Sequence, residues 1–384
     1  MDFAPTEDQE AFKKLIRDFC KRHCPPELDR EIENNSRFPE ELMPKLAETG
    51  VFGMCFPKEY GGYGGGAVDF CLAVEELTYR SEAAAACYLL PVFFAGQMIN
   101  LNGSEEQKRT YLPKIIGGKM KGAFALTEPE AGSDASAVST KAESDGKGSH
   151  LINGLKHYIS GADVADYIMT VTRTSPDKHG GITIFMVDRK SPGITITDQP
   201  KLGSRCVSLC QIQYDNVKVS DQMIIGGPGE LNGGWYQMMA SLDMERVMVA
   251  ISHVSLAQKA YEAALEYARV RKQFGRVIGK YQAIQFQLVN MAIDIEAGRN
   301  LAYKAAWLKD SGTAMAMEGS IAKIFCTEMA RRVTQTAMEV MGGQSYLMDS
   351  DVQRWVRMAL LGPVGMGTNN IQRLIVATAL GLTQ

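Results

Sequence analysis

The stretch Leu242-Asp243-Met244-Glu245-Arg246 carries the side chains with the clearest potential for chemistry in this chain. It lies in an apolar, methionine-rich run, 238–249, which predicts a helix. Carboxylates and arginines are rarely buried in such a run unless they are paired or used in a reaction. Taken alone, the stretch favours a simpler interpretation, in which Asp243 and Glu245 stabilise a helix start through its dipole.

Length and composition exclude several classes of protein. The chain has 384 residues, 22% of them charged and 45% hydrophobic, which indicates an ordinary globular protein of two or three domains. A net charge of -3 argues against binding to nucleic acid or to an anionic membrane. No apolar run reaches the roughly 20 residues needed to span a bilayer. The N-terminal residues lack the basic and apolar segments of a signal peptide, so we expect a cytoplasmic protein.

The eight cysteines show no C-x-x-C pair. Cys20, His23 and Cys24 share one face of a predicted helix and could hold a metal ion. Because no second pair of ligands stands nearby, we expect no metal site and treat the cysteines as small apolar residues.

The first third of the chain predicts helices. Capping boxes run from Thr6 to Gln9 and from Ser104 to Gln107, and a helix is expected over Ala67 to Arg80. A further helix is expected over Glu40 to Thr49. After Gly122, short runs rich in β-branched and aromatic residues predict the strands 123–127, 150–160, 167–173, 181–187 and 209–219.

Long helical patterns return after Gly234. They cover 235–272, 282–309, 315–340 and 368–380, and four long helices in series are typical of an up-and-down bundle. We therefore predict an α+β multidomain fold. Its parts are an N-terminal α-helical domain (1–120), a middle β-domain (121–230) and a C-terminal helical bundle (231–384).

No phosphate-binding loop of the Rossmann or P-loop type is present. A different polar segment, 126–134, follows the first predicted strand of the β-domain. Its glycine, hydroxyls and backbone amides could line a polar ligand, although such a segment is more often a tight turn.

This segment resembles a signature of the acyl-CoA dehydrogenase family, Thr-Glu-Pro-x-Ala-Gly-Ser-Asp. Other motifs similar to those of the family occur in the expected order along the whole chain. They are Lys156-His157-Tyr158-Ile159-Ser160, Arg271-Lys272-Gln273-Phe274-Gly275, Tyr281-Gln282-Ala283-Ile284-Gln285, Met341-Gly342-Gly343 and Gly367-Thr368-x-x-Ile371-Gln372-Arg373. Each motif is weak alone, whereas the ordered series is specific.

The resemblance implies an FAD enzyme with an α-domain, a middle β-barrel and a C-terminal four-helix bundle. It also implies a homotetramer, because FAD crosses a subunit interface in the family. The implied flavin contacts from the β-domain are Leu126, Thr127, Gly132, Ser133, Tyr158, Ile159 and Ser160. The other implied cofactor contacts are Arg271, Phe274, Gln282, Glu339, Gly342, Gly343, Thr368 and Asn370.

Two of these positions depart from the family pattern. Glu339 stands where a glutamine is usual, and a carboxylate near a pyrophosphate is unfavourable. Asn370 stands where a glutamate or glutamine is usual.

The family reaction removes a proton from the α-carbon of an acyl-CoA, which needs a carboxylate base. In most members this base is a glutamate directly before the Gly-Thr motif, and here that position is Met366. A minority, including isovaleryl-CoA dehydrogenase and crotonobetainyl-CoA reductase-like members, carries the base in a Glu-Arg pair on the long helix. The resemblance therefore implies that Glu245 is the catalytic base, with Arg246 as a substrate contact.

Three further substrate contacts are implied. Asp243 would bind the CoA side, Ser133 would contact the substrate beside the flavin, and the backbone amide of Met366 would donate to the thioester carbonyl.

We expect dehydrogenation of a short or branched acyl-CoA, with electrons passed to electron-transfer flavoprotein. Three alternatives stay open: an enoyl-CoA reductase running in the reverse direction, an oxidase, and a flavin- or acyl-CoA-binding subunit without turnover. An oxidase of this family usually carries a further C-terminal domain, which makes it the weaker alternative.

Overall fold

The computed structural model describes residues 4–382, and it begins with a helical domain. The two predicted capping boxes are confirmed at the starts of α1 and α7, where Thr6 and Ser104 each exchange hydrogen bonds with the residue three positions on. The expected helix at 40–49 is a 3₁₀ turn, Glu40–Leu42, followed by a short α3. The helices are α1 (Glu7–His23), α2 (Pro26–Asn35), α3 (Met43–Ala47), α4 (Ala67–Arg80), α5 (Glu82–Leu89), α6 (Met98–Asn102) and α7 (Glu105–Ile116).

A π-helical segment, Leu90–Gln97, joins α5 to α6. By length and composition alone, the resulting stretch Glu82–Asn102 is long and apolar enough to cross a membrane, although polar residues interrupt its apolar run at both ends. Two-thirds of its most apolar window, 67%, is buried inside the protein, as in the core helix of a globular domain. The sequence gives this stretch no amphipathic period, because it is apolar on every side.

The middle domain contains one curled sheet of seven strands. The order is β1-β4-β2-β3-β7-β6, and β5 pairs with the other edge of β4. β2 and β6 are short and largely exposed, which explains why the alternation of apolar residues did not predict them. The strands are β1 (Gly122–Ala125), β2 (Lys141–Ser144), β3 (Ser149–Ser160), β4 (Tyr167–Arg173), β5 (Ile182–Asp188), β6 (Ile194–Asp198) and β7 (Leu209–Ser220).

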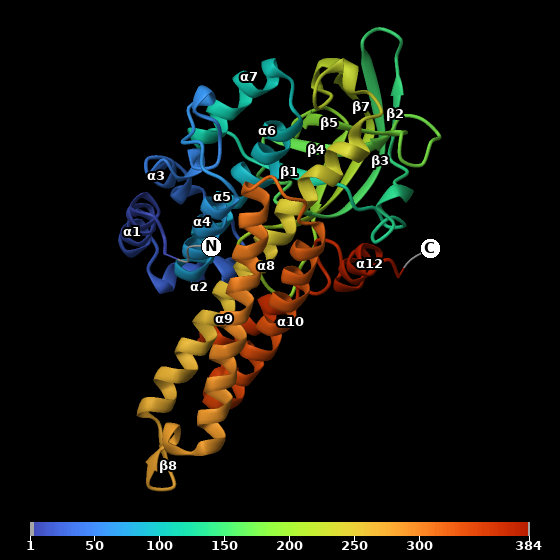
Figure 1. Cartoon of the computed structure of the whole chain (residues 1–384). Coiled ribbons are helices and arrows are strands. Elements are labelled where there is room, and N and C mark those ends of the chain that lie inside the picture. The colour runs from blue at the N-terminus through green and yellow to red at the C-terminus, as the bar shows by residue number, and fades with distance from the viewer. Residues whose placement is uncertain (1–3, 383–384) are drawn as a thin grey trace.

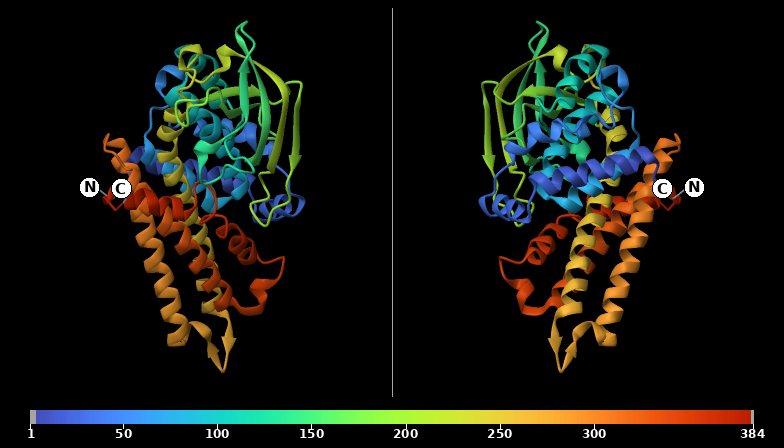
Figure 2. Two further views of the ribbon diagram at one scale, coloured as in Figure 1. Left: turned by 90° about the vertical axis from the view of Figure 1, so that its right-hand side faces the viewer. Right: turned by 90° about the vertical axis from the view of Figure 1, so that its left-hand side faces the viewer.

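The C-terminal bundle extends away from the other two domains as an arm (Figures 1 and 2). A hairpin of two short strands, β8 (Lys272–Gln273) and β9 (Arg276–Val277), forms the tip of this arm between α8 and α9 (Figure 1). α11 is an additional helix that the sequence did not predict. The helices are α8 (Gly234–Val270), α9 (Gln282–Asp310), α10 (Ala316–Met341), α11 (Asp351–Ala359) and α12 (Asn369–Ala379).

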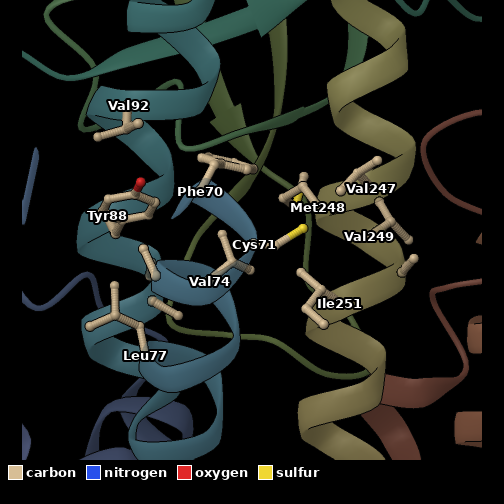
Figure 3. Close-up of a cluster of buried hydrophobic side chains, with 14 of the residues drawn as sticks. Phe70, Cys71, Val74, Leu77, Tyr88, Val92, Val247, Met248, Val249 and Ile251 are labelled. Carbon is tan, nitrogen blue, oxygen red and sulfur yellow. The ribbon is translucent and has the colours of Figure 1, made fainter. Parts of the chain in front are cut away.

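A continuous apolar core joins the N-terminal domain to the bundle. Figure 3 shows side chains of α4, among them Phe70, Cys71 and Val74, beside Val247 and Met248 of α8. These five residues are at most 3% exposed. Because this packing begins directly after Glu245, it fixes the part of α8 that carries the candidate base.

Candidate active site

Glu245 is the twelfth residue of α8, and it lines a small cavity of 40 Å³. The cavity is also lined by Phe93, Phe94 and Gln97 of the π-helical segment and by Phe124 of β1. Burial raises the pKa of Glu245 to about 7, and the positive charges of Arg246 and Lys323 limit that rise. A carboxylate whose pKa lies near neutrality is suited to accept a proton.

Arg246 and Asp243 form an ion pair on the side of α8 that faces α10 and α12. Arg246 Nη1 donates to Asp243 Oδ1 over 2.6 Å, and its Nε donates to Gln372 Oε1 over 3.1 Å. Arg246 is 8% exposed, so its guanidinium is held by these protein partners. Its expected contact with substrate stays a prediction, as does that of Asp243.

The loop before α12 carries Met366, whose backbone has a left-handed φ of 51°. The ammonium group of Lys323, a fully buried side chain of α10, donates to the carbonyl oxygens on both sides of Met366. Its Nζ lies 3.3 Å from Gly365 O and 2.9 Å from Gly367 O, and it also reaches Asn369 Oδ1 at 2.9 Å. The carbonyl groups of Gly365 and Gly367 therefore both point toward the buried ammonium group of Lys323. Within the described residues no hydrogen bond uses the Met366 N–H, which leaves it available as a donor.

Thr368 and Asn370 stand at the start of α12, beside this loop. The Thr368 hydroxyl accepts from Ile371 N and caps the helix. Asn370 is exposed, and its side chain contacts Arg373 at 3.5 Å. Neither arrangement tests the expected cofactor contacts of these two residues.

In the β-domain, a buried ion pair holds the segment that follows β1. Lys156 Nζ lies 2.8 Å from Glu128 Oε1 and donates to Leu126 O at 2.9 Å. The Glu128 carboxylate also accepts from Ser139 and Thr140. The Lys156 charge and these donors outweigh burial and hold the pKa of Glu128 at about 2, so the pair is ionised at neutral pH.

Tyr158 sits at an irregularity of β3. The β3–β7 register shifts between Lys156 and Ile159, and Tyr158 has a left-handed φ of 59°. Such bulges re-aim side chains and occur next to functional sites. Tyr158 is exposed, whereas Ile159 is buried in the β-domain core, so only the backbone of Ile159 is available to a ligand.

The residues expected at the pyrophosphate and adenine end lie elsewhere. Arg271 and Gln282 flank the hairpin at the tip of the arm, and Phe274 lies in its turn and is 93% exposed. Glu339, Gly342 and Gly343 are exposed at the end of α10, which runs back toward that tip. The 25 residues from Glu245 to Val270 on α8 span roughly 38 Å. The tip of the arm therefore lies far from the Glu245 cavity within one copy of the chain.

Each group on its own fits part of FAD. A Cβ atom added to Gly132, Gly342 or Gly343 would meet nothing within 4 Å, so all three backbones face open space that a ligand can approach. Ser133 is exposed beside Gly132, and Thr127 and Ser160 are partly exposed. These hydroxyls and free backbone groups suit a polar ring system, and the arginine at position 271 suits a phosphate.

Sequence reasoning missed the residues that position this site. Lys323 and Gln372 hold the Met366 loop, and Phe93 and Phe94 face Glu245 from the π-helical segment. A lysine in the apolar run of α10 was the only available signal for the first of these.

Comparisons with known proteins indicate one and the same family along nearly the whole chain. Three family descriptions match: "Acyl-CoA dehydrogenase, N-terminal domain" over residues 6–119, the middle domain over 123–217 and the C-terminal domain over 232–381. The chain is 37% identical to the probable acyl-CoA dehydrogenase YngJ of Bacillus subtilis, over 99% of this chain and 100% of that protein. It is 35% identical to the caffeyl-CoA reductase-Etf complex subunit CarC of Acetobacterium woodii, over 98% of each chain. The butyryl-CoA dehydrogenase structure from Megasphaera elsdenii superposes with a TM-score of 0.94 at 34% identity, covering 99% of this chain and 100% of that one.

Proposed function

Because this chain belongs to the acyl-CoA dehydrogenase family, an FAD-dependent family of oxidoreductases, we propose that it dehydrogenates a short or branched acyl-CoA with Glu245 as the base. One observation carries this proposal. Glu245 lines an apolar cavity with a pKa of about 7, while Met366 occupies the loop position where a side chain cannot accept a proton.

In this proposal α8 supplies the proton acceptor, and the Met366 loop supplies a hydrogen-bond donor. Glu245 accepts the α-proton at its carboxylate. The Met366 N–H donates to the thioester carbonyl and stabilises the negative charge that develops there. Lys323, Gln372 and Arg246 hold that loop against α8 and α10.

Bound FAD would supply the acceptor for the hydride that leaves the β-carbon. Leu126, Thr127, Gly132, Ser133, Tyr158 and Ser160 would hold its ring end, and Thr368 and Asn370 lie at the neighbouring loop. Arg271, Phe274, Gln282, Gly342 and Gly343 would hold its pyrophosphate and adenine. Glu339 is exposed at the same end, and we expect its charge to weaken rather than support that contact.

A second copy of the chain completes the site in this proposal. The hairpin residues of one copy would reach the cofactor that lies on the β-domain of the next copy, because the tip of the arm lies far from the Glu245 cavity within one chain. The exposed apolar side chains Phe286, Val289 and Ile293 on α9 support an interface along the bundle. We propose a homotetramer on this basis.

We propose electron-transfer flavoprotein as the electron acceptor. The relative CarC is named as a subunit of a reductase–Etf complex, which supports such a partner. The same name favours one alternative, a reductase that runs the reaction in reverse on an enoyl-CoA. Glu245 would then donate the α-proton instead of accepting it.

The proposal is tested with the flavin-loaded protein and a series of acyl-CoAs from butyryl- to isovaleryl-CoA, by following the flavin absorbance. We expect bleaching with wild type. Glu245→Gln should keep FAD and lose turnover by roughly 10³- to 10⁴-fold. Asp243→Asn is the matched neutral change two residues earlier, and its loss should be smaller. Full turnover by Glu245→Gln would remove Glu245 from the reaction.

A further inference from the structure

A second cavity, of 180 Å³, adjoins the cavity that Glu245 lines, since Phe94 lines both. Met366 also lines this second cavity. The cavity therefore begins beside the loop whose backbone N–H would hold the thioester carbonyl in the proposed function. An apolar cavity of about 150 Å³ holds a benzene molecule, so this one has room for an apolar group of about six carbon atoms.

The lining surface of this cavity is mostly apolar, and two helical stretches form its sides. α5 contributes Ala86 and Leu89, and α8 contributes Met248 and Leu256. Ala86, Met248 and Leu256 are buried. Walls of this kind favour a hydrocarbon group, because a polar group that enters them loses its hydrogen bonds to water.

The two stretches pass each other in opposite directions, which gives the cavity two different ends. Phe94 and Glu245 meet at the end where the proposed chemistry takes place. At the other end Glu82, which also lines the cavity, accepts a hydrogen bond from Lys259 Nζ over 2.9 Å. Lys259 lies 14 residues after Glu245, roughly 21 Å along α8. The ion pair of Glu82 and Lys259 therefore lies at the end of the cavity away from the candidate base.

The Glu82 carboxylate is fixed by three donors from two helices. Besides Lys259 of α8, Trp355 Nε1 of α11 donates to Oε1 over 3.1 Å, and the guanidinium of Arg354 bonds to Oε2. Burial alone would raise the pKa of Glu82, but the charges of Lys259 and Arg354 lower it overall, so the carboxylate is ionised at neutral pH. Separating a buried ion pair leaves uncompensated charges, so an apolar chain does not readily displace this network.

We propose that the Glu82 network (Glu82, Lys259, Arg354 and Trp355) closes the acyl cavity and sets the greatest acyl length that the enzyme accepts. A chain of up to roughly six to eight carbon atoms ends in front of this network, whereas a longer chain would have to displace the buried ion pairs. This inference rests on the proposed dehydrogenation at Glu245 and adds the residues that limit its substrate.

The test measures kcat/KM for butyryl-, hexanoyl-, octanoyl- and dodecanoyl-CoA on the flavin-loaded enzyme. Ratios between these substrates are compared, because a general loss of activity leaves a ratio unchanged. In wild type we expect kcat/KM to be at least about tenfold higher for hexanoyl-CoA than for dodecanoyl-CoA, since a single methylene group changes kcat/KM by about that much in a closed pocket.

Two variants change the depth of the cavity in opposite directions. Leu256 stands three residues before Lys259, so Leu256→Ala adds space in front of the network. It should raise the octanoyl to hexanoyl ratio about tenfold, while dodecanoyl-CoA stays poor because the network itself is unchanged. Ala86→Leu fills part of the cavity and should lower the hexanoyl to butyryl ratio about tenfold.

Leu77→Ala is the matched control for Leu256→Ala. Leu77 of α4 is also buried, but it is not a lining residue of this cavity. Its truncation creates a void elsewhere in the core and should leave all the ratios within about twofold of wild type.

Equal kcat/KM for hexanoyl- and dodecanoyl-CoA in wild type would overturn the inference, and so would an octanoyl ratio that Leu256→Ala leaves unchanged. If Leu256→Ala does not bind FAD, the wild-type ratio and the effect of Ala86→Leu decide. A preference for glutaryl-CoA over hexanoyl-CoA would also overturn it, because Lys201 on the same cavity wall would then bind a carboxylate. Flavin that no acyl-CoA bleaches, isovaleryl-CoA included, would instead contradict the proposed dehydrogenation.

Discussion

Glu245 and Met366 line two cavities that share Phe94, and they stand on very different supports. Glu245 stands on a 37-residue helix whose next turns are buried against α4. Met366 stands on a loop in a left-handed conformation, held by the hydrogen bonds of Lys323 and Gln372. The helix can present a side chain in one fixed direction, whereas the loop presents a backbone N–H. In the proposed function the helix would supply the proton acceptor, and the loop would keep its backbone donor.

Apart from removal of the proposed base itself, the largest expected effect comes from releasing the loop. Lys323→Met removes the donor to Gly365 O, Gly367 O and Asn369 Oδ1. Gly365 O then loses its partner, while Gly367 O keeps the Gln372 amide. We expect kcat/KM to fall by roughly 100-fold, the scale of a misplaced contact. Steady-state kinetics on the flavin-loaded variant measures this.

The same variant carries an internal check. The Lys323 charge favours the ionised form of Glu245, so removing that charge should raise the pKa of the Glu245 carboxyl. The rising limb of the plot of activity against pH should then move to higher pH. Lys323→Arg keeps the charge and should leave the limb closer to wild type. A profile that stays in place in Lys323→Met would contradict the coupling between loop and helix.

The second expected effect is the pH dependence of the wild type. The pKa of Glu245 is raised to about 7, and only the ionised carboxylate accepts a proton, so activity is complete above this value and is lost as the pH falls through it. We expect kcat/KM to decrease about tenfold per pH unit below pH 7. A profile that is flat down to pH 5 would contradict a base with this pKa.

The smallest effect is expected from the Met366 side chain. Met366→Gly relieves a left-handed φ of 51° at a residue with a side chain, and it keeps the backbone N–H. We expect the free energy of unfolding to change by less than about 1 kcal/mol, in the stabilising direction. The kcat/KM should stay within about tenfold of wild type, and a larger loss would show that the side chain itself takes part.

Local signals in the sequence predicted the elements that local interactions determine. The capping boxes at Thr6 and Ser104 and the helix 67–80 are confirmed, because each depends on residues only a few positions apart. β2 and β6 were missed because their exposed, polar residues give no apolar alternation. The π-helical segment was missed because it is apolar on every side.

The candidate site also contains residues that local motifs predict and residues that only long-range contacts reveal. The family motifs predicted Glu245 and the segment around Thr127 from nearby residues. Gln372 lies 126 residues after its partner Arg246, and Lys323 lies 44 residues before its acceptor Gly367. Such contacts form only when separate helices pack together, so spacing along the chain does not reveal them.

The most direct test of the account is the exchange of the substrate α-proton in D₂O, measured with the flavin held reduced so that oxidation cannot follow. Wild type should exchange the α-proton of isovaleryl-CoA, and Glu245→Gln should lose exchange by roughly 10³-fold or more. The double variant Glu245→Gln/Met366→Glu, which returns a carboxylate to the loop, should recover part of it. Undiminished exchange in Glu245→Gln would contradict the assignment of the base to α8.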